Sequence, residues 1–165
     1  MDGRQATARR GSVAGVSERV KPAAAGWGPV PVTEGEWAGW SAWQLDAFET
    51  LAGPFYEKTD DNGERVTAFR AEPRHLNGAG KMHGGCLLTF ADSALFTIAS
   101  RELEGTFGVT VNLTGDFLDP VEVGQLVEAR GRVVRAGGKT IFVEGLATAD
   151  GKPVLRFNGI IRKLR

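Results

Sequence analysis

The stretch HLNGAGKMHGGCLLTFADSALF, residues 75–96, decides the fold. It begins as polar, glycine-rich chain and continues as an apolar segment with helical spacing, from which we predict a helix over about 85–102. Apolar residues cover most of the circumference of this helix, as expected of a helix enclosed by a sheet. One carboxylate, Asp92, lies among them, one turn after Leu88 and one turn before Phe96. Apolar surroundings disfavour its charge, so its position requires a reason.

Extended segments lie on both sides of this helix in the sequence. A hairpin is predicted before it, over 55–60 and 64–72, because turn residues separate two β-prone runs. Short connections favour an antiparallel sheet, and the helix must cover its apolar face. We therefore predict an α+β fold in which a curved, mostly antiparallel sheet of five to six strands wraps around one long central helix. The strands after the helix are predicted over about 106–118, 125–136, 139–149 and 152–164.

The chain before the hairpin is interpreted as two parts. Residues 1–26 are small, polar and charged, which predicts a flexible tail. In residues 27–53, Thr33 and Glu36 have the spacing of a capping box, which predicts a Trp-containing helical lead-in packed on the main domain at 54–165. A Trp-lined binding surface is the alternative interpretation. The residues that would share one helical face are Trp37, Trp40, Phe48 and Leu51.

Composition excludes several classes of protein. The 165 residues include 20 Lys and Arg and 20 Asp and Glu, so the formal net charge is zero and no basic block indicates a nucleic-acid partner. The single cysteine, Cys86, excludes an internal disulfide framework. No apolar run reaches the roughly 18 residues of a membrane span. We therefore expect a cytoplasmic protein that binds neither nucleic acid nor membrane.

The residues before the predicted helix suit a polarised ligand. His83, Gly84 and Gly85 lie where free N–H groups and the positive end of the helix dipole collect. Glycine allows a carbonyl group to approach the main chain, and an N–H aimed at that oxygen stabilises an oxyanion. Asn77 adds an amide that orients a water or a carbonyl. With Asp92 as base or nucleophile, this set suits acyl transfer to water, in one cavity or in one shared with a second subunit.

The sequence also allows other roles for these residues. Asp92 can instead form an ion pair or accept hydrogen bonds at a subunit seam. Cys86 follows His83 by three residues, but nothing supplies the third, orienting group of a cysteine nucleophile, so a buried small residue is the preferred interpretation. His75 is interpreted as a loop-stabilising hydrogen-bond residue. The two histidines and Asp92 form no recognised metal-ligand spacing, so no metal site is predicted.

The stretch resembles the signature of hotdog-fold acyl-CoA thioesterases of the PaaI type. The pattern is an Asn, then HGG, then an Asp nine residues after the His, and the resemblance covers about 45–165. It implies the hotdog fold and the hydrolysis of an acyl-CoA thioester with an aromatic or medium-chain acyl group, without a cofactor. The residues that match the pattern are Asn77, His83, Gly84, Gly85 and Asp92.

The resemblance also implies a role for each matching residue. Asp92 would be the catalytic carboxylate, as nucleophile or as general base on water. The Gly84 N–H would polarise the thioester carbonyl, with His83 supporting the turn. Asn77 would position the water or the carbonyl, and Thr110 matches the position of a residue that holds the water.

Substrate binding and assembly are implied in the same way. Gly85 would contact the substrate. Basic residues in the hairpin between the strands predicted at 125–136 and 139–149 would bind the CoA phosphates. The alternative is that this hairpin is only a solvated turn. The hairpin residues in question are Arg135, Gly138 and Lys139. The family builds its sites across the interface of a homodimer, often within a homotetramer. The alternative functions are a hotdog hydratase or dehydratase and a non-catalytic acyl-CoA-binding protein.

Overall fold

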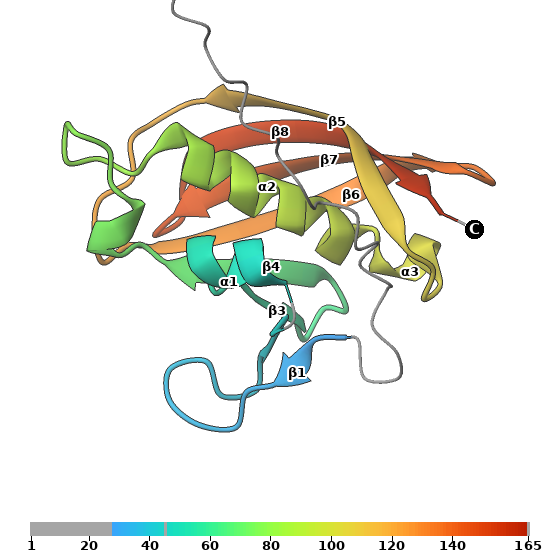
Figure 1. Ribbon diagram of the computed structural model, residues 1–165, viewed down its shortest axis with the longest axis horizontal. Helices are drawn as coiled ribbons and strands as arrows, with labels where there is room; N and C mark the ends of the chain where they lie inside the picture. The colour runs from blue at the N-terminus through green and yellow to red at the C-terminus, as the bar shows by residue number, and fades with distance from the viewer. Residues whose placement is uncertain (1–27, 45, 165) are drawn as a thin grey trace, which may run out of the picture.

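The computed structural model describes residues 28–44 and 46–164, with helix α2 at its centre (Figure 1). The tail predicted at 1–26 lies outside the described residues. Within these residues, three α-helices and a short 3-10 helix at Pro73–His75 accompany the strands: α1 Ala47–Ala52, α2 Gly84–Ile98 and α3 Ser100–Leu103. The strands are β1 Val30–Pro31, β2 Ser41–Ala42, β3 Tyr56–Thr59, β4 Arg65–Arg70, β5 Gly108–Phe117, β6 Leu126–Ala136, β7 Thr140–Ala149 and β8 Lys152–Lys163.

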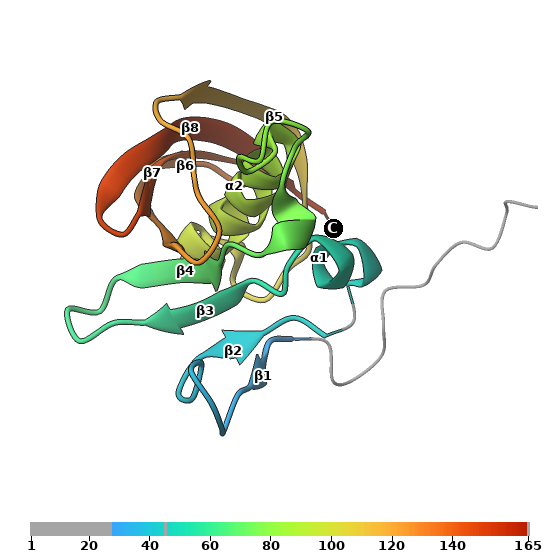
Figure 2. The ribbon, with the colours of Figure 1, turned by 90° about the vertical axis from the view of Figure 1, so that its left-hand side faces the viewer.

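The strands form one sheet in the order β1-β2-β3-β4-β6-β7-β8-β5, and every neighbouring pair is antiparallel. Figure 2 shows the sheet curling around α2. The predicted curved antiparallel sheet around one central helix is therefore confirmed. The predicted number of five to six strands is wrong, because the described residues contain eight. The difference arises in the lead-in, where β1 and β2 extend the sheet beyond β3.

The lead-in is mostly not helical, which corrects the helix predicted from Thr33 and Glu36. Between β1 and β2 the chain turns through Gly35 and Gly39, whose φ angles of 75° and 85° are left-handed and interrupt a helix. Trp37 stacks on Tyr56 of β3 at 4.2 Å between ring centroids, so the tryptophan packs on a strand. Helicity is confined to α1, where Phe48 and Leu51, expected on a packed face, are 65% and 73% exposed.

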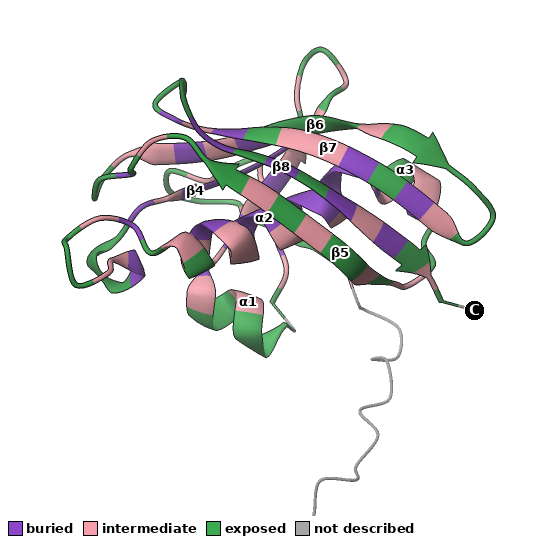
Figure 3. Ribbon diagram, turned by 90° about the horizontal axis from the view of Figure 1, so that it is seen from above, coloured by how far each residue is buried: buried purple, intermediate pink, exposed green. Residues whose placement is uncertain are grey.

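Helix α2 provides the core that positions the site. Its apolar stripe packs against the concave face of the sheet, while the strands alternate between buried and exposed residues (Figure 3). Gly159 of β8 allows close approach, because a Cβ there would lie 2.4 Å from the Leu95 side chain. The predicted helix is divided at Ala99, after which α3 continues. The buried α2 residues are Leu87, Phe90, Ala91, Ala94, Leu95, Thr97 and Ile98.

The last strand in the sheet order, β5, has a sheet neighbour on one side only. It pairs with β8, and its other edge has no partner strand within residues 28–44 and 46–164. Side chains of Val109, Val111 and Phe117 are 42%, 55% and 53% exposed along it. An apolar edge strand is a template for pairing with another chain. Among the helices that the structure describes, none is long and apolar enough to cross a membrane.

Candidate active site

The N-terminus of α2 is capped by His83. Its Nδ1 accepts a hydrogen bond from the Gly85 N–H at 2.9 Å, and its carbonyl oxygen accepts from Cys86 and Leu87 at 2.9 and 3.3 Å. The Gly84 N–H has no acceptor among the residues that the structure describes. This half-buried amide is therefore the donor left over in the first turn, which is the position that an oxyanion would use.

The loop before this turn is organised by Asn77 and closed at its base by His75. The Asn77 Oδ1 accepts from the N–H groups of Ala79 and Lys81 at 2.8 and 3.3 Å, and the His75 carbonyl accepts from the His83 N–H at 2.7 Å. The His75 ring is buried, and its Nδ1 accepts from the Glu72 N–H at 3.0 Å. Burial lowers the pKa of His75. The predicted loop-stabilising role of His75 is thus confirmed, and Asn77 also acts within its own loop.

The half-buried carboxylate of Asp92 is joined to β5. The Thr110 hydroxyl donates to Asp92 Oδ1 at 2.6 Å, so the structure brings together two of the predicted site residues. One carboxylate oxygen is held by this bond, and the other has no hydrogen-bond partner among residues 28–44 and 46–164. Leu88 and Phe96 flank Asp92 one turn away, as the sequence predicts, and all three line one cavity.

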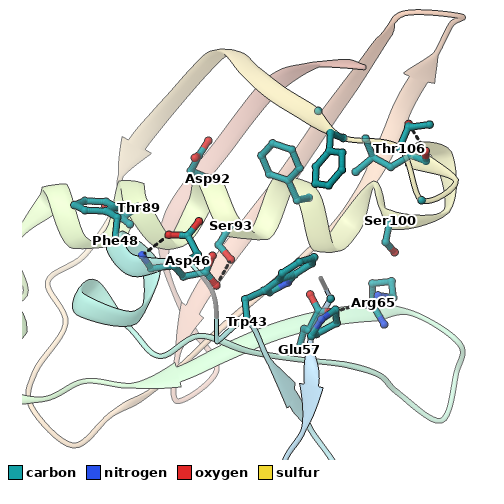
Figure 4. Close-up of a pocket in the computed structure, with 18 of the residues that line it drawn as sticks. Trp43, Asp46, Phe48, Glu57, Arg65, Thr89, Asp92, Ser93, Ser100 and Thr106 are labelled. Carbon is teal, nitrogen blue, oxygen red and sulfur yellow. Dashed lines mark hydrogen bonds and ion pairs between the residues drawn. The ribbon is translucent and has the colours of Figure 1, made fainter. Parts of the chain in front are cut away.

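That cavity has a volume of about 850 Å³ and follows α2 from Leu88 to the α3 end. Figure 4 shows Asp92, Thr89 and Phe48 toward one end, and Arg65 and Ser100 toward the other. The lead-in, β3, β4 and the chain before β5 supply the opposite walls. Aromatic side chains from these elements, Trp43, Phe48 and Phe107, together with Phe96, make much of the lining apolar. Trp43 lines this cavity, whereas Trp37 and Trp40, the tryptophans of the alternative Trp-lined surface, do not.

The two groups of predicted catalytic residues occupy different places on one chain. Gly84 and Asp92 are separated by eight residues of α2, which corresponds to about 12 Å along the helix axis. The lining of the Asp92 cavity includes neither Asn77 nor His83 nor Gly84. A single thioester cannot place its carbonyl oxygen on the Gly84 amide and its carbonyl carbon beside Asp92 of the same chain.

Sequence reasoning missed a second carboxyl group in the cavity, that of Glu49 on α1. The Ser93 hydroxyl donates to Glu49 Oε1 at 3.1 Å, and Ser93 directly follows Asp92. Burial raises the pKa of Glu49 to about 7, with Asp46, Glu57 and Asp92 adding to the effect. Asp46 caps α1 by accepting from the Glu49 N–H at 2.9 Å, so the spacing of the two residues indicates the start of a helix but not that Glu49 lines a cavity.

A polar network closes the other end of the cavity. Arg65 donates to Glu57 at 2.6 Å, and Thr97 of α2 donates to the other oxygen of Glu57 at 2.9 Å. The side chains of Arg65 and Glu57 are 23% and 10% exposed. A buried ion pair of this kind is costly unless both partners are hydrogen-bonded, and here they are. The network ties β3 and β4 to α2 and fixes that wall of the cavity.

The remaining predicted residues lie elsewhere. Arg135, Gly138 and Lys139 are exposed at the β6–β7 hairpin, and none lines the Asp92 cavity. Gly85 is exposed, and its N–H donates to His83 Nδ1.

Burial raises the pKa of Cys86 to about 11, which disfavours the thiolate that a nucleophile requires. Within residues 28–44 and 46–164, no three His, Cys, Asp or Glu side chains gather to hold a metal ion.

Comparisons with known proteins place the chain in a family. The sequence profile of the thioesterase superfamily matches residues 79–155. A Pseudomonas aeruginosa protein named "Putative esterase PA0474" is 34% identical over 112 residues, which is 67% of this chain and 83% of that protein. The Escherichia coli PaaI protein from the phenylacetic acid degradation operon matches 73% of this chain and 86% of its own, at 25% identity and a TM-score of 0.64.

A structure determined with CoA is also similar. The BH2602 protein from Bacillus halodurans matches 66% of this chain and 73% of its own, at 27% identity and a TM-score of 0.62. The residues matched by the superfamily profile, 79–155, include the helix that carries Asp92 and strands β5, β6 and β7.

Proposed function

Because this chain belongs to the PaaI-type hotdog thioesterases of the thioesterase superfamily, we propose that it hydrolyses the thioester bond of an acyl-CoA to give a free acid and CoA. The observation that carries the proposal is Asp92, which lines a cavity with apolar and aromatic walls and accepts a hydrogen bond from Thr110. A carboxylate held by one hydrogen bond keeps its second oxygen for chemistry, and the cavity accepts an aromatic or medium-chain acyl group.

The complete site forms between two copies of the chain. The 12 Å spacing along α2 keeps Gly84 and Asp92 of one copy apart, whereas a two-fold arrangement brings Gly84 of one copy to Asp92 of the other. The exposed apolar edge of β5 provides a surface for that second copy. Since Thr110 also lies on β5, pairing there would enclose the reacting atoms at the interface. We thus expect at least a homodimer, with a dimer of dimers compatible with the same contact.

The chemistry follows from these positions. The carbonyl oxygen accepts from the Gly84 N–H of one copy, which stabilises the negative charge that develops on it. As a general base, Asp92 of the other copy removes a proton from the water whose oxygen bonds to the carbonyl carbon; the carbon–sulfur bond then breaks, and that proton passes to the CoA thiolate. As a nucleophile, Asp92 bonds to the carbonyl carbon and displaces the CoA thiolate; water then hydrolyses the resulting anhydride to the free acid, which restores the carboxylate and supplies the proton for the thiolate. His83 holds the turn through Gly85, and the Asn77 amide N–H groups orient the water or carbonyl.

Binding of the CoA part is assigned to exposed cationic residues. Arg135 and Lys139 lie at the β6–β7 hairpin, where Gly138 keeps the backbone open to a ligand. Their charges suit the phosphates of CoA. The similarity to a protein crystallised with CoA supports a CoA ester as the substrate.

The test of this proposal is a panel of acyl-CoA esters with aromatic and medium-chain acyl groups, monitored with a thiol-trapping dye. The proposal predicts release of free CoA from at least one class of ester. A protein that binds acyl-CoA but releases no thiol from any ester would instead be an acyl-CoA-binding protein. A hydratase would instead add water to enoyl-CoA without releasing thiol, which loss of the enoyl absorbance would reveal.

A further inference from the structure

We propose that Glu49 is a specificity-determining residue whose carboxyl group binds a hydroxyl, or another hydrogen-bond donor, on the acyl group of the substrate. The inference rests on the proposed thioesterase function and adds the class of acyl group. Glu49 belongs to α1 in the lead-in, outside residues 79–155 that match the superfamily profile.

The position of Glu49 places its carboxyl close to the reaction centre. It lines the same cavity as Asp92, and it is held there by the Ser93 hydroxyl, which donates to Oε1 at 3.1 Å. Asp92 and Glu49 line one cavity and lie close enough for the charge of Asp92 to raise the pKa of Glu49, so an acyl group whose carbonyl lies beside Asp92 shares that cavity with the Glu49 carboxyl.

The hydrogen bonding of Glu49 is incomplete. Its Oε1 accepts from Ser93, but Oε2 has no hydrogen-bond partner within residues 28–44 and 46–164. Among the same residues no Lys or Arg forms an ion pair with Glu49, because Arg65, the cation that lines the cavity, is paired with Glu57. Glu49 is half-buried, and water reaches its Oε2 when the cavity holds no ligand. A donor on the ligand would satisfy the second oxygen.

The rest of the cavity limits what carries that donor. Around Glu49 the lining includes the side chains of Trp43, Phe48, Leu88 and Phe96. These surfaces favour an apolar acyl body, and Glu49 is one of the polar groups of the lining, with Asp46, Thr89 and Ser93, that can contact a donor on it. The substrates that combine both properties are CoA esters of hydroxylated aromatic acids or of β-hydroxy aliphatic acids of medium length.

The pKa of Glu49 adds a dependence on pH. Burial raises it to about 7, and the carboxylates facing it are Asp46 on its own helix, Glu57 on β3 and Asp92 on α2. As the pH rises through about 7, Glu49 ionises. The carboxylate is a stronger hydrogen-bond acceptor for a hydroxyl, and an apolar group placed against it removes water from the charge at a cost in free energy. The preference for a hydroxylated ester over its parent is therefore expected to increase with pH.

The experiment compares kcat/KM for two matched pairs of esters, meta-hydroxybenzoyl-CoA with benzoyl-CoA and β-hydroxyhexanoyl-CoA with hexanoyl-CoA. For the natural chain, the ratio of hydroxylated to parent ester is expected to exceed one in at least one pair. Glu49→Leu should lower that ratio about 10-fold or more, because the hydroxyl loses its acceptor. Glu49→Gln keeps an acceptor and should retain most of the preference, but its ratio should not change between pH 6 and 8. Effects of pH on the hydrolytic step common to both esters of a pair cancel in the ratio.

Glu34→Gln is the matched control, since Glu34 is exposed in the same lead-in and does not line the cavity. Its ratios should equal those of the natural chain. An unchanged ratio in Glu49→Leu, with melting temperature retained, would overturn the proposal. A natural chain that hydrolyses the parent esters and never prefers the hydroxylated ones would do the same while leaving the thioesterase function intact. Failure to hydrolyse any ester would instead contradict the proposed function itself.

Discussion

Replacing Asp92 with Asn is expected to lower kcat for acyl-CoA hydrolysis by roughly 10³-fold while leaving acyl-CoA binding within about 3-fold. The amide has the shape of the carboxylate, and its oxygen can still accept a hydrogen bond from the Thr110 hydroxyl. In the natural chain that hydroxyl donates to Asp92 Oδ1 at 2.6 Å. What it loses is basicity and nucleophilicity. Thiol release gives kcat, and calorimetric titration with a non-hydrolysable acyl-CoA thioether gives the Kd.

A matched control separates loss of this carboxylate from loss of charge in general. Asp61 is exposed in the β3–β4 turn and has no bearing on the cavity, so Asp61→Asn should keep the natural kcat. An Asp92→Asn protein that folds, binds the thioether and retains more than about a tenth of the natural kcat would contradict the assigned role, because general-base or nucleophilic catalysis contributes more than that.

Gly84→Pro is expected to lower kcat by about 10²- to 10³-fold, the effect of removing one oxyanion donor. Proline lacks the N–H but suits this position, because Gly84 is the first residue of α2. The preceding residue must be extended, and His83 has φ −67° and ψ 131°. The substitution therefore removes one donor without breaking a helical hydrogen bond. Thiol release again measures kcat, and a thermal melt confirms folding.

Gly84→Ala is the control for the added side chain. A Cβ at this position would lie 3.1 Å from the Phe117 ring, which is 53% exposed and free to shift. Alanine brings the same contact as proline but keeps the N–H, so its kcat should stay within about 5-fold of the natural value. Equal losses in the two variants would mean that crowding by Phe117, and not the missing amide, lowers the rate.

The central part of the fold could be predicted because its signals are local. The 75–96 stretch and the turn residues after it define α2 and the strands that follow, and each strand appears within a few residues of its predicted bounds. The lead-in was mispredicted because its structure depends on tertiary contacts. Trp37 has helical spacing from Trp40, but its stacking on Tyr56 and the left-handed turns at Gly35 and Gly39 commit the chain to strands.

The sequence predicts which residues could form the candidate site better than it predicts how they are arranged in space. The contact between Asp92 and Thr110 follows from a helix lying across β5, as the motif suggests. Glu49 could not be placed, because its approach to Ser93 depends on how a six-residue helix docks on α2. Sequence spacing alone also left open whether Gly84 and Asp92 share a cavity. The structure answers this for one chain, because they lie about 12 Å apart along one helix axis.

The most direct test of a site shared between two copies is subunit mixing. Asp92→Asn and Gly84→Pro chains are co-expressed with different tags, and the doubly tagged dimers are purified. Each such dimer contains one site with both natural groups and one site with neither, so it should recover about half of the natural activity per dimer. Activity that stays at the level of the two parent variants would show that Asp92 and Gly84 act within a single chain, and would contradict the shared site.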